Sequence, residues 1–354
     1  MENFELTSRL RVGILGAGAF ASRRHLPELV ADSRIEVVAA CRRDQDALTA
    51  FADHFGIKHR YADWREMLDK ANLDAVLIAT PHNQHAEQTE SALRQGVHVL
   101  LEKPMALTGA EARSLRDLAK SSGLVLAVAF NPPYWSHTRA LRAGILSDRI
   151  GILETVSLSW IGNVEHVFAK TPASAPSTQA AASIVAPTMF RADAAQNGGG
   201  QFMDGGGHLL SELLWVTGRR AVEVSAQMDR YPNDMRSHIS IRLEGDVLAS
   251  VTSVGNSRHL KRRLNSRYYG ATGTANANGL DFTVAWTDEQ GTTETQSQNE
   301  GLEIAPTPVG DWLHSIESGA RLEPQGSADH AVHVTELLEA AYLSAKTGKQ
   351  ISLS

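Results

Sequence analysis

The feature that most constrains the fold of this chain is a short apolar run that ends at two closely spaced glycines. Residues 11–15 (RVGIL) have the pattern of a buried strand, and residues 16–21 (GAGAFA) follow at once as G-x-G-x-x-A. In such a loop Gly16 permits a tight turn, Gly18 lets the backbone approach a pyrophosphate, and Ala21 allows close packing of helix and strand. The following helix offers N–H donors to an anion. The pattern predicts a dinucleotide-binding βαβ unit; the alternative is a strand–helix turn with a purely structural role.

Strands and helices alternate through the first half of the chain. Apolar runs lie at 35–40, 75–79, 98–101 and 124–129, and helical patterns lie between them at 44–55, at 84–95 and from Thr108 to Gly123. Thr108 and Glu111 form a capping box at the start of the last of these helices. The alternation indicates βαβ units, and therefore an α/β fold with an N-terminal Rossmann domain built on a doubly wound parallel sheet.

After about residue 150 the pattern changes to strands with few helices between them. The β-rich runs lie at 153–160, 222–227, 238–243, 247–254, 267–270 and 282–286. They predict a C-terminal α+β domain with an open, mostly antiparallel sheet. We therefore expect a Rossmann dinucleotide-binding domain over residues 1–130 and a substrate-binding and oligomerisation domain over 131–354.

Two segments of the second domain stand out. Residues 163–200 are rich in Ala, Ser, Pro and Gly, which fits either a surface insertion or a substrate lid or oligomer arm. Residues 335–347 have one apolar helical face. We expect them to form a docked terminal helix that could pack back on the Rossmann domain.

Composition excludes several classes of function. The chain has 34 Lys and Arg against 40 Asp and Glu, a net charge of −6, which disfavours binding to nucleic acid. Its one cysteine rules out an intrachain disulfide and a multi-cysteine zinc site, and we expect no metal site. The first residues, MENFELTSRL, do not resemble a signal peptide, and no apolar run reaches the roughly 18 residues of a membrane span. We expect a cytoplasmic protein with no membrane partner.

The end of the second strand bears on the choice between NAD and NADP. NAD sites usually place an acidic residue about 20 residues after the glycines, where it holds the ribose 2′-hydroxyl. Here Arg42 and Arg43 stand there, followed by Asp44. Two cations fit a 2′-phosphate, so this position favours NADP over NAD. The alternatives are that the arginines are solvated while Asp44 caps the next helix, or that an arginine stacks on adenine in an NAD enzyme.

Two polar segments follow predicted parallel strands. They are residues 80–85 (TPHNQH) and residues 102–104 (EKP), and both should lie at the carboxyl edge of the sheet, where ligands bind. Lys103 is therefore placed near the cofactor, where its ammonium could hold a hydroxyl group. An ordinary surface lysine is the alternative.

Asp204 and His208 are candidate catalytic residues of the second domain. They are four residues apart, so they share a face if the segment is helical, although Gly205, Gly206 and Gly207 favour placing Asp204 before the helix. A histidine with a carboxylate partner is a natural general base. The alternatives are a buried pair that serves packing alone or a pair of metal ligands.

Tyr134 and Trp135 could stack against a sugar ring, or could simply pack between the domains.

A family resemblance accounts for these motifs together. The segments GILGAGAFA, ATPHNQHAE and HVLLEKPMA, and then DRIGILETV, GGGQFMDGGGH and EAAYLSAKTGK, resemble the glucose–fructose oxidoreductase and inositol dehydrogenase (Gfo/Idh/MocA) family. The resemblance spans nearly the whole chain except about residues 163–195, and the tripeptide E-K-P is its most specific element. It implies a Rossmann domain joined to an open α/β domain, in an NAD(P)-dependent enzyme of sugars or cyclitols that assembles as a dimer or tetramer.

The resemblance also implies roles for individual residues. Thr80, Pro81, His85, Glu102 and Asn131 would line the cofactor, and Lys103 would lie near the nicotinamide. The complete predicted cofactor-binding set is Gly16, Gly18, Ala19, Phe20, Arg42, Arg43, Thr80, Pro81, His82, His85, Glu102, Lys103 and Asn131. The catalytic set is Lys103, Asp204 and His208, and the substrate set adds Tyr134 and Trp135. The family pattern D-x-G-x-H-x-x-D is incomplete, because Ser211 stands where the second aspartate belongs and Glu212 lies one position further on.

The sequence therefore predicts an NAD(P)-dependent oxidoreductase of a secondary alcohol or ketone in a sugar, glycoside or cyclitol. One alternative is a redox-neutral enzyme that oxidises a sugar transiently so that elimination cleaves a glycosidic bond. Another is a non-catalytic regulator that senses the nucleotide. The partners expected are a carbohydrate or cyclitol substrate and further copies of the chain, as a homodimer or homotetramer.

Overall fold

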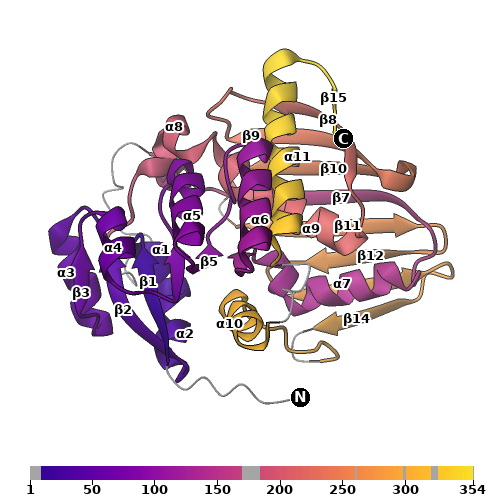
Figure 1. Cartoon of the computed structure of the whole chain (residues 1–354). Helices are drawn as coiled ribbons and strands as arrows, with labels where there is room; N and C mark the ends of the chain where they lie inside the picture. Colours follow the sequence, from indigo (N-terminus) through magenta and orange to yellow (C-terminus); the bar gives the residue numbers. More distant parts are fainter. Residues whose placement is uncertain (1–8, 170–183, 260, 298–299, 320–325, 354) are drawn as a thin grey trace. The chain divides into compact units, whose positions relative to one another are not determined.

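A computed structural model describes residues 9–169, 184–259, 261–297, 300–319 and 326–353 (Figure 1). The chain divides into two compact units. Unit 1 comprises Met1–Ala129, Lys170–Phe190 and Pro308–Ala328, and unit 2 comprises Phe130–Ala169, Arg191–Thr307 and Asp329–Ser354. Among the residues that the structure describes, no helix combines the length and the apolar character that a membrane span requires. The predicted division at residue 130 stays a prediction, as does the packing of the terminal helix on the Rossmann domain.

Unit 1 is built on a six-stranded sheet with the order β3-β2-β1-β4-β5-β6, and every paired strand is parallel. Its strands are β1 (Leu10–Leu15), β2 (Ile35–Cys41), β3 (His59–Tyr61), β4 (Ala75–Ile78), β5 (His98–Leu101) and β6 (Leu126–Val128). The order reverses between β1 and β4, as in doubly wound dinucleotide-binding sheets. The predicted Rossmann fold is therefore confirmed.

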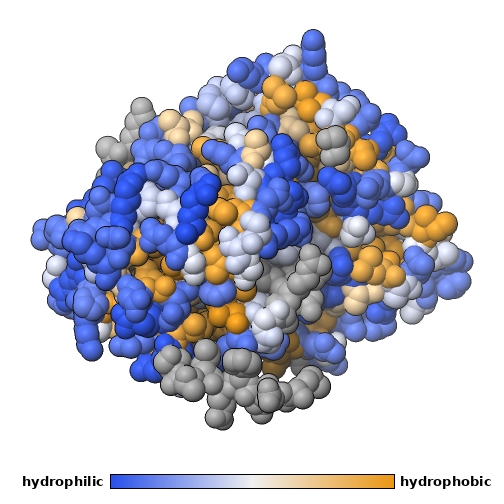
Figure 2. Space-filling model, viewed as in Figure 1, coloured by the Kyte–Doolittle hydropathy of each residue, from blue (hydrophilic) through white to orange (hydrophobic). Residues whose placement is uncertain are grey.

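The helices of unit 1 are α1 (Ala19–Arg24), α2 (Leu26–Ala31), α3 (Gln45–Phe55), α4 (Trp64–Lys70), α5 (His85–Arg94), α6 (Gly109–Ser122) and α10 (Pro308–Ser318), with a short 3-10 helix at His82–Gln84. Three of them (α3, α4 and α6) begin at a residue whose side chain caps them. Thr108 and Glu111 form the predicted capping box of α6, and Gly123 ends it in the left-handed region, at φ +67°. Over α3, α4 and α5 the visible surface is mostly hydrophilic, as expected for helices that bury one side (Figure 2).

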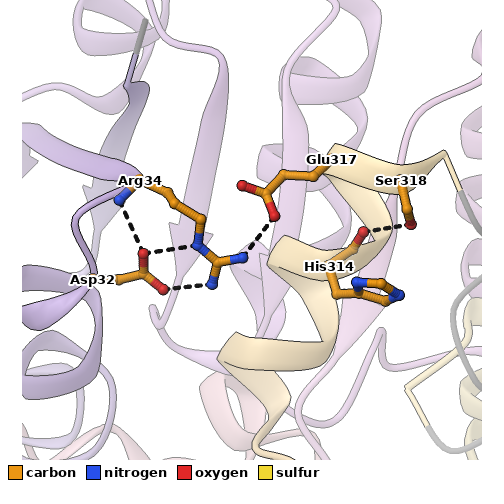
Figure 3. Close-up of polar contacts among 5 residues, drawn as sticks. All are labelled: Asp32, Arg34, His314, Glu317 and Ser318. Atoms are coloured by element: carbon orange, nitrogen blue, oxygen red, sulfur yellow. Dashed lines mark hydrogen bonds and ion pairs between the residues drawn. The ribbon is translucent and has the colours of Figure 1, made fainter. Parts of the chain in front are cut away.

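A late segment of the chain completes unit 1. Helix α10 contributes Trp312, which is fully buried in the same cluster as Phe51 and Leu77. Arg34 links this helix to the start of β2, because its Nη1 donates to Glu317 Oε2 at 2.6 Å while its Nη2 lies 2.6 Å from Asp32 Oδ2 (Figure 3). The Arg34 guanidinium lowers the pKa of Asp32 from its usual value. The Rossmann unit is thus assembled from distant parts of the chain.

Unit 2 is built on a nine-stranded sheet with the order β14-β13-β12-β11-β7-β10-β9-β8-β15, in which only β7 and β10 pair in parallel. Its strands are β7 (Leu153–Ile161), β8 (Ala221–Met228), β9 (Arg236–Leu243), β10 (Leu248–Val254), β11 (Arg263–Gly270), β12 (Gly273–Asn278), β13 (Thr283–Asp288), β14 (Thr293–Ser297) and β15 (Ile351–Ser352). This confirms the predicted mostly antiparallel sheet. The sequence missed β12 (GTANAN) and β14 (TETQS), since the apolar face of β12 consists only of Ala275 and Ala277 and β14 has no apolar residue.

Helices cover one face of this sheet. The helices of unit 2 are α7 (Ser136–Leu146), α8 (Ala194–Asn197), α9 (Gly207–Thr217) and α11 (Ala328–Thr347), and α7, α9 and α11 lie over the strands in Figure 1. Shorter turns are the 3-10 helices Pro132–Tyr134, Glu165–Val167, Phe190–Ala192 and Glu244–Asp246, and the π-helix Phe202–Gly206. Along β9, buried Ile239 and Ile241 alternate with exposed Arg236, His238 and Arg242. The outer face of β9 is therefore polar, and the predicted homo-oligomer stays a prediction.

Candidate functional site

The two glycines of the first loop are needed for different reasons. Gly16 has φ +90°, and a Cβ there would lie 2.5 Å from the Ala79 carbonyl oxygen at the end of β4. Both the positive φ and the close contact therefore exclude a side chain at Gly16. Gly18 has an extended backbone, and a Cβ there would meet nothing closer than the Gly16 carbonyl oxygen at 3.7 Å. Packing does not require a glycine at Gly18, so the open space before Ala19 and Phe20 fits the close approach of a dinucleotide phosphate.

Arg42 lies against this loop. Its Nη1 donates to the Ala17 carbonyl oxygen at 3.0 Å, and its Nη2 lies 4.0 Å from Asp44 Oδ2. The Asp44 carboxylate also accepts from the Ala47 N–H and caps α3, as one alternative proposed. Arg43 is exposed. No acidic residue ends β2: its last residue is Cys41, and burial raises the pKa of that thiol to about 12.

The segment after β4 is braced by a buried histidine. His85 has its Nδ1 2.7 Å from the Pro104 carbonyl oxygen and its Nε2 3.0 Å from the Thr80 carbonyl oxygen. Burial lowers the pKa of His85. His82 is also buried, and its ring packs edge-on against Phe190 at 5.1 Å. His85 therefore joins the Thr80–Pro81 turn to the Glu102–Lys103–Pro104 turn.

Lys103 is not a surface lysine. Its exposed fraction is 8%, and it joins Pro104 through a cis peptide bond. Glu102 beside it is held by His25, whose Nε2 lies 2.6 Å from Glu102 Oε1, and Glu102 Oε2 accepts from the Lys103 N–H at 3.3 Å. Both partners are buried, His25 at 2% and Glu102 at 8% exposure. The sequence analysis missed His25, because nothing local links the junction of α1 and α2 to the end of β5.

In unit 2, Asp204 and His208 lie in one continuous helical segment. Asp204 is in the π-helix Phe202–Gly206, and His208 is in the first turn of α9, which follows directly. Asp204 precedes α9, as the glycines led us to expect, but it lies in a π-helical turn that runs directly into that helix. A Cβ at Gly206 would lie 2.2 Å from the Phe202 ring, so these glycines permit a wide helical turn in a crowded place. The Phe130 ring meets the His208 ring edge-on at 6.4 Å.

A buried network supports this segment. Tyr342 of α11 donates its hydroxyl to Asp234 Oδ1 at 2.5 Å and accepts from the N–H groups of Gly200 and Met203 at 3.1 and 3.0 Å. Asp234 Oδ2 accepts from the Phe202 N–H at 2.9 Å. Burial raises the pKa of Asp234. The glycine-rich segment before α9 is therefore fixed by residues far away in the sequence.

Asp204 has an ionic partner that the sequence analysis did not anticipate. Arg191 Nε lies 3.0 Å from Asp204 Oδ1, with side-chain exposures of 23% and 19%. Arg191 belongs to the 3-10 turn Phe190–Ala192, near the end of the weakly patterned segment 163–200. That segment was expected to be an insertion, a lid or an arm; its residues 170–183 lie outside those that the structure describes.

The residues near the incomplete family pattern have structural partners. Ser211 Oγ lies 2.9 Å from His330 Nε2, and burial lowers the pKa of His330 to about 3. Glu212 faces the sheet, where the Tyr268 hydroxyl donates to its Oε1 at 3.3 Å. Burial raises the pKa of Glu212 to about 7. Neither residue is therefore a simple replacement for the missing aspartate.

Tyr134 and Trp135, the candidates for stacking against a sugar ring, take part in packing within unit 2. Tyr134 has an exposed fraction of 7% and lies in the 3-10 helix that follows Asn131. Trp135 stacks on His137 at 5.6 Å, and Phe282 meets the Trp135 ring edge-on at 5.9 Å. This favours the packing alternative for Tyr134, while a sugar contact by either residue stays a prediction.

Two further features are the grouping of possible metal ligands and the position of the surface pocket relative to the predicted site residues. In the described part of the chain, no three His, Cys, Asp or Glu side chains gather closely enough to hold a metal ion. A pocket of about 330 Å³ lies beside the first half of β2, where Arg9, Lys58 and His59 help to line it. None of the predicted site residues lines this pocket.

These features define a class of protein: a dinucleotide-binding Rossmann unit with a buried lysine at the carboxyl edge of its sheet, linked to a mostly antiparallel unit. Residues 10–130 match the model of the oxidoreductase family with an NAD-binding Rossmann fold, and residues 151–276 match the GFO/IDH/MocA C-terminal domain. The chain belongs to this GFO/IDH/MocA oxidoreductase family. The family predicted from the sequence is thereby confirmed.

Curated relatives match part of the chain. Over 156 residues it is 35% identical to the dTDP-3,4-didehydro-2,6-dideoxy-alpha-D-glucose 3-reductase of Streptomyces violaceoruber, covering 44% of this chain and 45% of that protein. Over 151 residues it is 33% identical to the D-glucoside 3-dehydrogenase of Escherichia coli, covering 43% of each. The chain thus spans less than half the length of these relatives.

Solved structures match the whole fold. A levoglucosan dehydrogenase in complex with NADH and levoglucosan superposes with a TM-score of 0.81 at 19% identity, covering 98% of this chain and 99% of that one. An oxidoreductase domain protein from Kribbella flavida gives 0.81 at 21% identity, covering 98% and 100%. At these identities the likeness establishes the fold alone.

Proposed function

We propose that this protein is an NAD(P)-dependent oxidoreductase that acts on a secondary alcohol, or the corresponding ketone, of a sugar, glycoside or cyclitol. The observation that carries the proposal lies within unit 1. The open space at Gly18 supports dinucleotide binding there, and the same sheet edge holds Lys103 at 8% exposure beside a buried Glu102. A lysine this buried is rare unless it has a specific partner or task. The names of the sugar-acting relatives support the substrate class.

The chemistry needs one hydride and one proton to move. A bound nicotinamide would supply the hydride acceptor for the alcohol and the hydride donor for the ketone. As the C–H hydride leaves the alcohol, the O–H proton passes to the His208 imidazole, the side-chain type that ordinarily titrates nearest to neutral pH. The Lys103 ammonium holds the substrate oxygen as the carbonyl forms. In the ketone direction, His208 returns the proton to that oxygen.

The test is a turnover screen followed by two variants. Absorbance of reduced nicotinamide is monitored with sugars, glycosides and cyclitols, using NAD and NADP separately. We expect His208→Ala and Lys103→Ala each to lower kcat roughly 10²–10⁴-fold, the usual contribution of general acid–base groups, while the dinucleotide still binds. His314→Ala, at an exposed histidine of α10, is the control. Nearly full turnover by His208→Ala would assign the base to another residue.

We further propose that NADP is preferred over NAD. The support is that β2 ends at Cys41 and that Arg42 and exposed Arg43 follow it. Arg43 is the better residue to exchange, because the Arg42 guanidinium also holds the glycine loop through Ala17. Arg43→Ala should weaken NADPH binding about tenfold, as expected when a hydrogen bond to a charged group is lost, and should leave NADH binding nearly unchanged.

The control for this measurement is Arg94→Ala, which removes an exposed arginine whose partner, Glu90, lies one helical turn away. Fluorescence titration of the unmutated protein gives the preference directly. Tighter binding of NADH than of NADPH would overturn the proposal.

A further inference from the structure

The π-helix Phe202–Gly206 begins without a cap from its own sequence. The side chain of the residue before it makes no capping hydrogen bond. The first N–H groups of a helix have no partner within the helix and need one from elsewhere. Here distant side chains supply it: Asp234 Oδ2 accepts from the Phe202 N–H at 2.9 Å, and the Tyr342 hydroxyl accepts from the Met203 N–H at 3.0 Å. Contacts from elsewhere in unit 2 thus replace the local cap.

The Tyr342 hydroxyl uses its full capacity for hydrogen bonds in this position. A hydroxyl has one proton to donate and two lone pairs that accept. Tyr342 donates to Asp234 Oδ1 at 2.5 Å and accepts from the N–H groups of Gly200 and Met203. Tyr342 is 6% exposed and Asp234 is 0% exposed. Two buried side chains therefore fix where the π-helical turn starts.

Helix α11, which carries Tyr342, also meets the other end of this turn. Leu338 lies one helical turn before Tyr342, and a Cβ built at Gly207 would lie 3.5 Å from its side chain. Asp204 lies between these two contacts, and His208 follows Gly207 directly. The same helix therefore holds the chain on both sides of Asp204 and just before His208.

A π-helical turn needs such anchoring, because it is rare compared with an α-helical turn and occurs frequently at functional sites. We propose that Tyr342, together with Asp234, is a positioning residue that holds this turn and thereby orients Asp204 and His208 for proton transfer. Without the hydroxyl, the turn relaxes and Asp204 rotates relative to His208 around the helix axis. The proposal rests on the proposed function, because it takes His208 as the group that exchanges the proton.

The first test is Tyr342→Phe, which removes the hydroxyl and keeps the ring that packs near Phe202 at 6.5 Å. With a substrate from the turnover screen, kcat should fall about 10–100-fold, because small displacements of catalytic groups are costly. The affinity for the dinucleotide, whose proposed site lies in unit 1, should stay unchanged. Tyr231→Phe is the matched control: Tyr231 is 48% exposed, its ring lies 6.4 Å from the Tyr342 ring, and its variant should keep full kcat.

A double variant separates positioning from plain stabilisation. In a His208→Ala background, Tyr342→Phe should lower kcat by less than about twofold more, because no imidazole is left to orient. A purely structural tyrosine would lower the melting temperature at full kcat, or lower kcat by the same factor with and without His208; either result would overturn the proposal. If Tyr342→Phe does not fold, Ser237→Ala takes its place. It removes the hydrogen bond from Ser237 Oγ to Asp234 Oδ2 at 2.7 Å and should lower kcat about threefold, whereas full kcat would contradict the proposal.

A measurement without substrate keeps this proposal separate from the proposed function. The ring signal of His208 in the nuclear magnetic resonance spectrum is identified by its loss in His208→Ala. It should shift in Tyr342→Phe and stay in place in Tyr231→Phe. If the unmutated protein oxidises no sugar, the proposed function fails while this signal still tests how Tyr342 holds the ring. An unchanged His208 signal in Tyr342→Phe refutes the positioning role alone.

Discussion

The two units each contain a glycine-rich turn before a helix, and the turns differ at Gly18 in unit 1 and at Gly199 and Gly200 in unit 2. In unit 1 the position of Gly18 is open, with nothing within 3.7 Å of a Cβ built there. In unit 2 the corresponding space is filled: a Cβ at Gly199 would lie 2.5 Å from the Tyr342 ring, and one at Gly200 would lie 2.2 Å from the Asp234 carbonyl oxygen. The turn of unit 1 is open at Gly18, whereas in the turn of unit 2 the space beside the glycines is filled by Tyr342 and Asp234.

Buried carboxyl groups show a parallel contrast. Glu102 of unit 1 has a basic partner, His25, at 2.6 Å. Glu212 of unit 2 is also buried but meets the neutral hydroxyl of Tyr268, and burial raises its pKa to about 7. A buried carboxyl group among neutral groups holds its proton. The contrast between the units can therefore be tested by the stability of glycine variants and by the pH dependence of stability.

The largest effect should come from Gly200→Ala. The added Cβ would lie 2.2 and 2.3 Å from the backbone oxygen and nitrogen of Asp234, which cannot move aside as a side chain can. We expect a loss of more than about 3 kcal/mol in the free energy of unfolding, measured in urea, or failure to fold. Gly207→Ala is the control in the same turn, because its Cβ would lie 3.5 Å from Leu338 in ordinary contact. Equal stabilities of the two variants would show that the turn is not tightly packed.

The next effect is a pH dependence that originates at Glu212. Its pKa is about 7 in the folded protein against an ordinary 4.5, so folding favours the protonated form. The stability contributed by Glu212 is complete below about pH 4.5 and is lost as the pH rises through about 7. This amounts to on the order of 3 kcal/mol. Glu212→Gln cannot ionise, so it should be more stable than the unmutated protein at pH 8 and similar to it at pH 4. Parallel stability profiles of the two proteins would contradict this assignment.

The contrast between the units also explains how much the sequence could predict. The Rossmann sheet, the capping of α6 by Thr108 and the placement of Lys103 at a strand end depend on signals a few residues long, so they could be predicted. The predicted sites themselves still await the experiments above. The π-helical turn is held by Asp234 and Tyr342, which lie far away in the sequence.

The residues that the sequence analysis missed share one property. Arg191 meets Asp204 only because the intervening chain is folded back, and His25 meets Glu102 across 77 residues. Periodicity and motif spacing report on neighbours along the chain, so contacts of this kind leave no local signal. The glycines at 198–200 show a related difficulty, because their sequence does not reveal whether a ligand or a tyrosine occupies the space.

The smallest effect on stability, and the sharpest separation of the two turns, should come from Gly18→Ala. The backbone at Gly18 is extended, with φ −114° and ψ −179°, and the nearest atoms to an added Cβ lie at 3.7 and 3.9 Å. Alanine fits this conformation, so the variant should be as stable as the unmutated protein or more stable by about 0.5 kcal/mol, since alanine loses less entropy on folding. Dinucleotide binding should nevertheless weaken, because the methyl group occupies the space that the pyrophosphate needs.

Gly16→Ala is the control within the same loop and should be destabilised, because its φ is +90° and its Cβ would lie 2.5 Å from the Ala79 carbonyl oxygen. Unfolding in urea and fluorescence titration with NADPH separate the two effects, and undiminished binding by Gly18→Ala would mean that the open space in unit 1 is not where the dinucleotide lies.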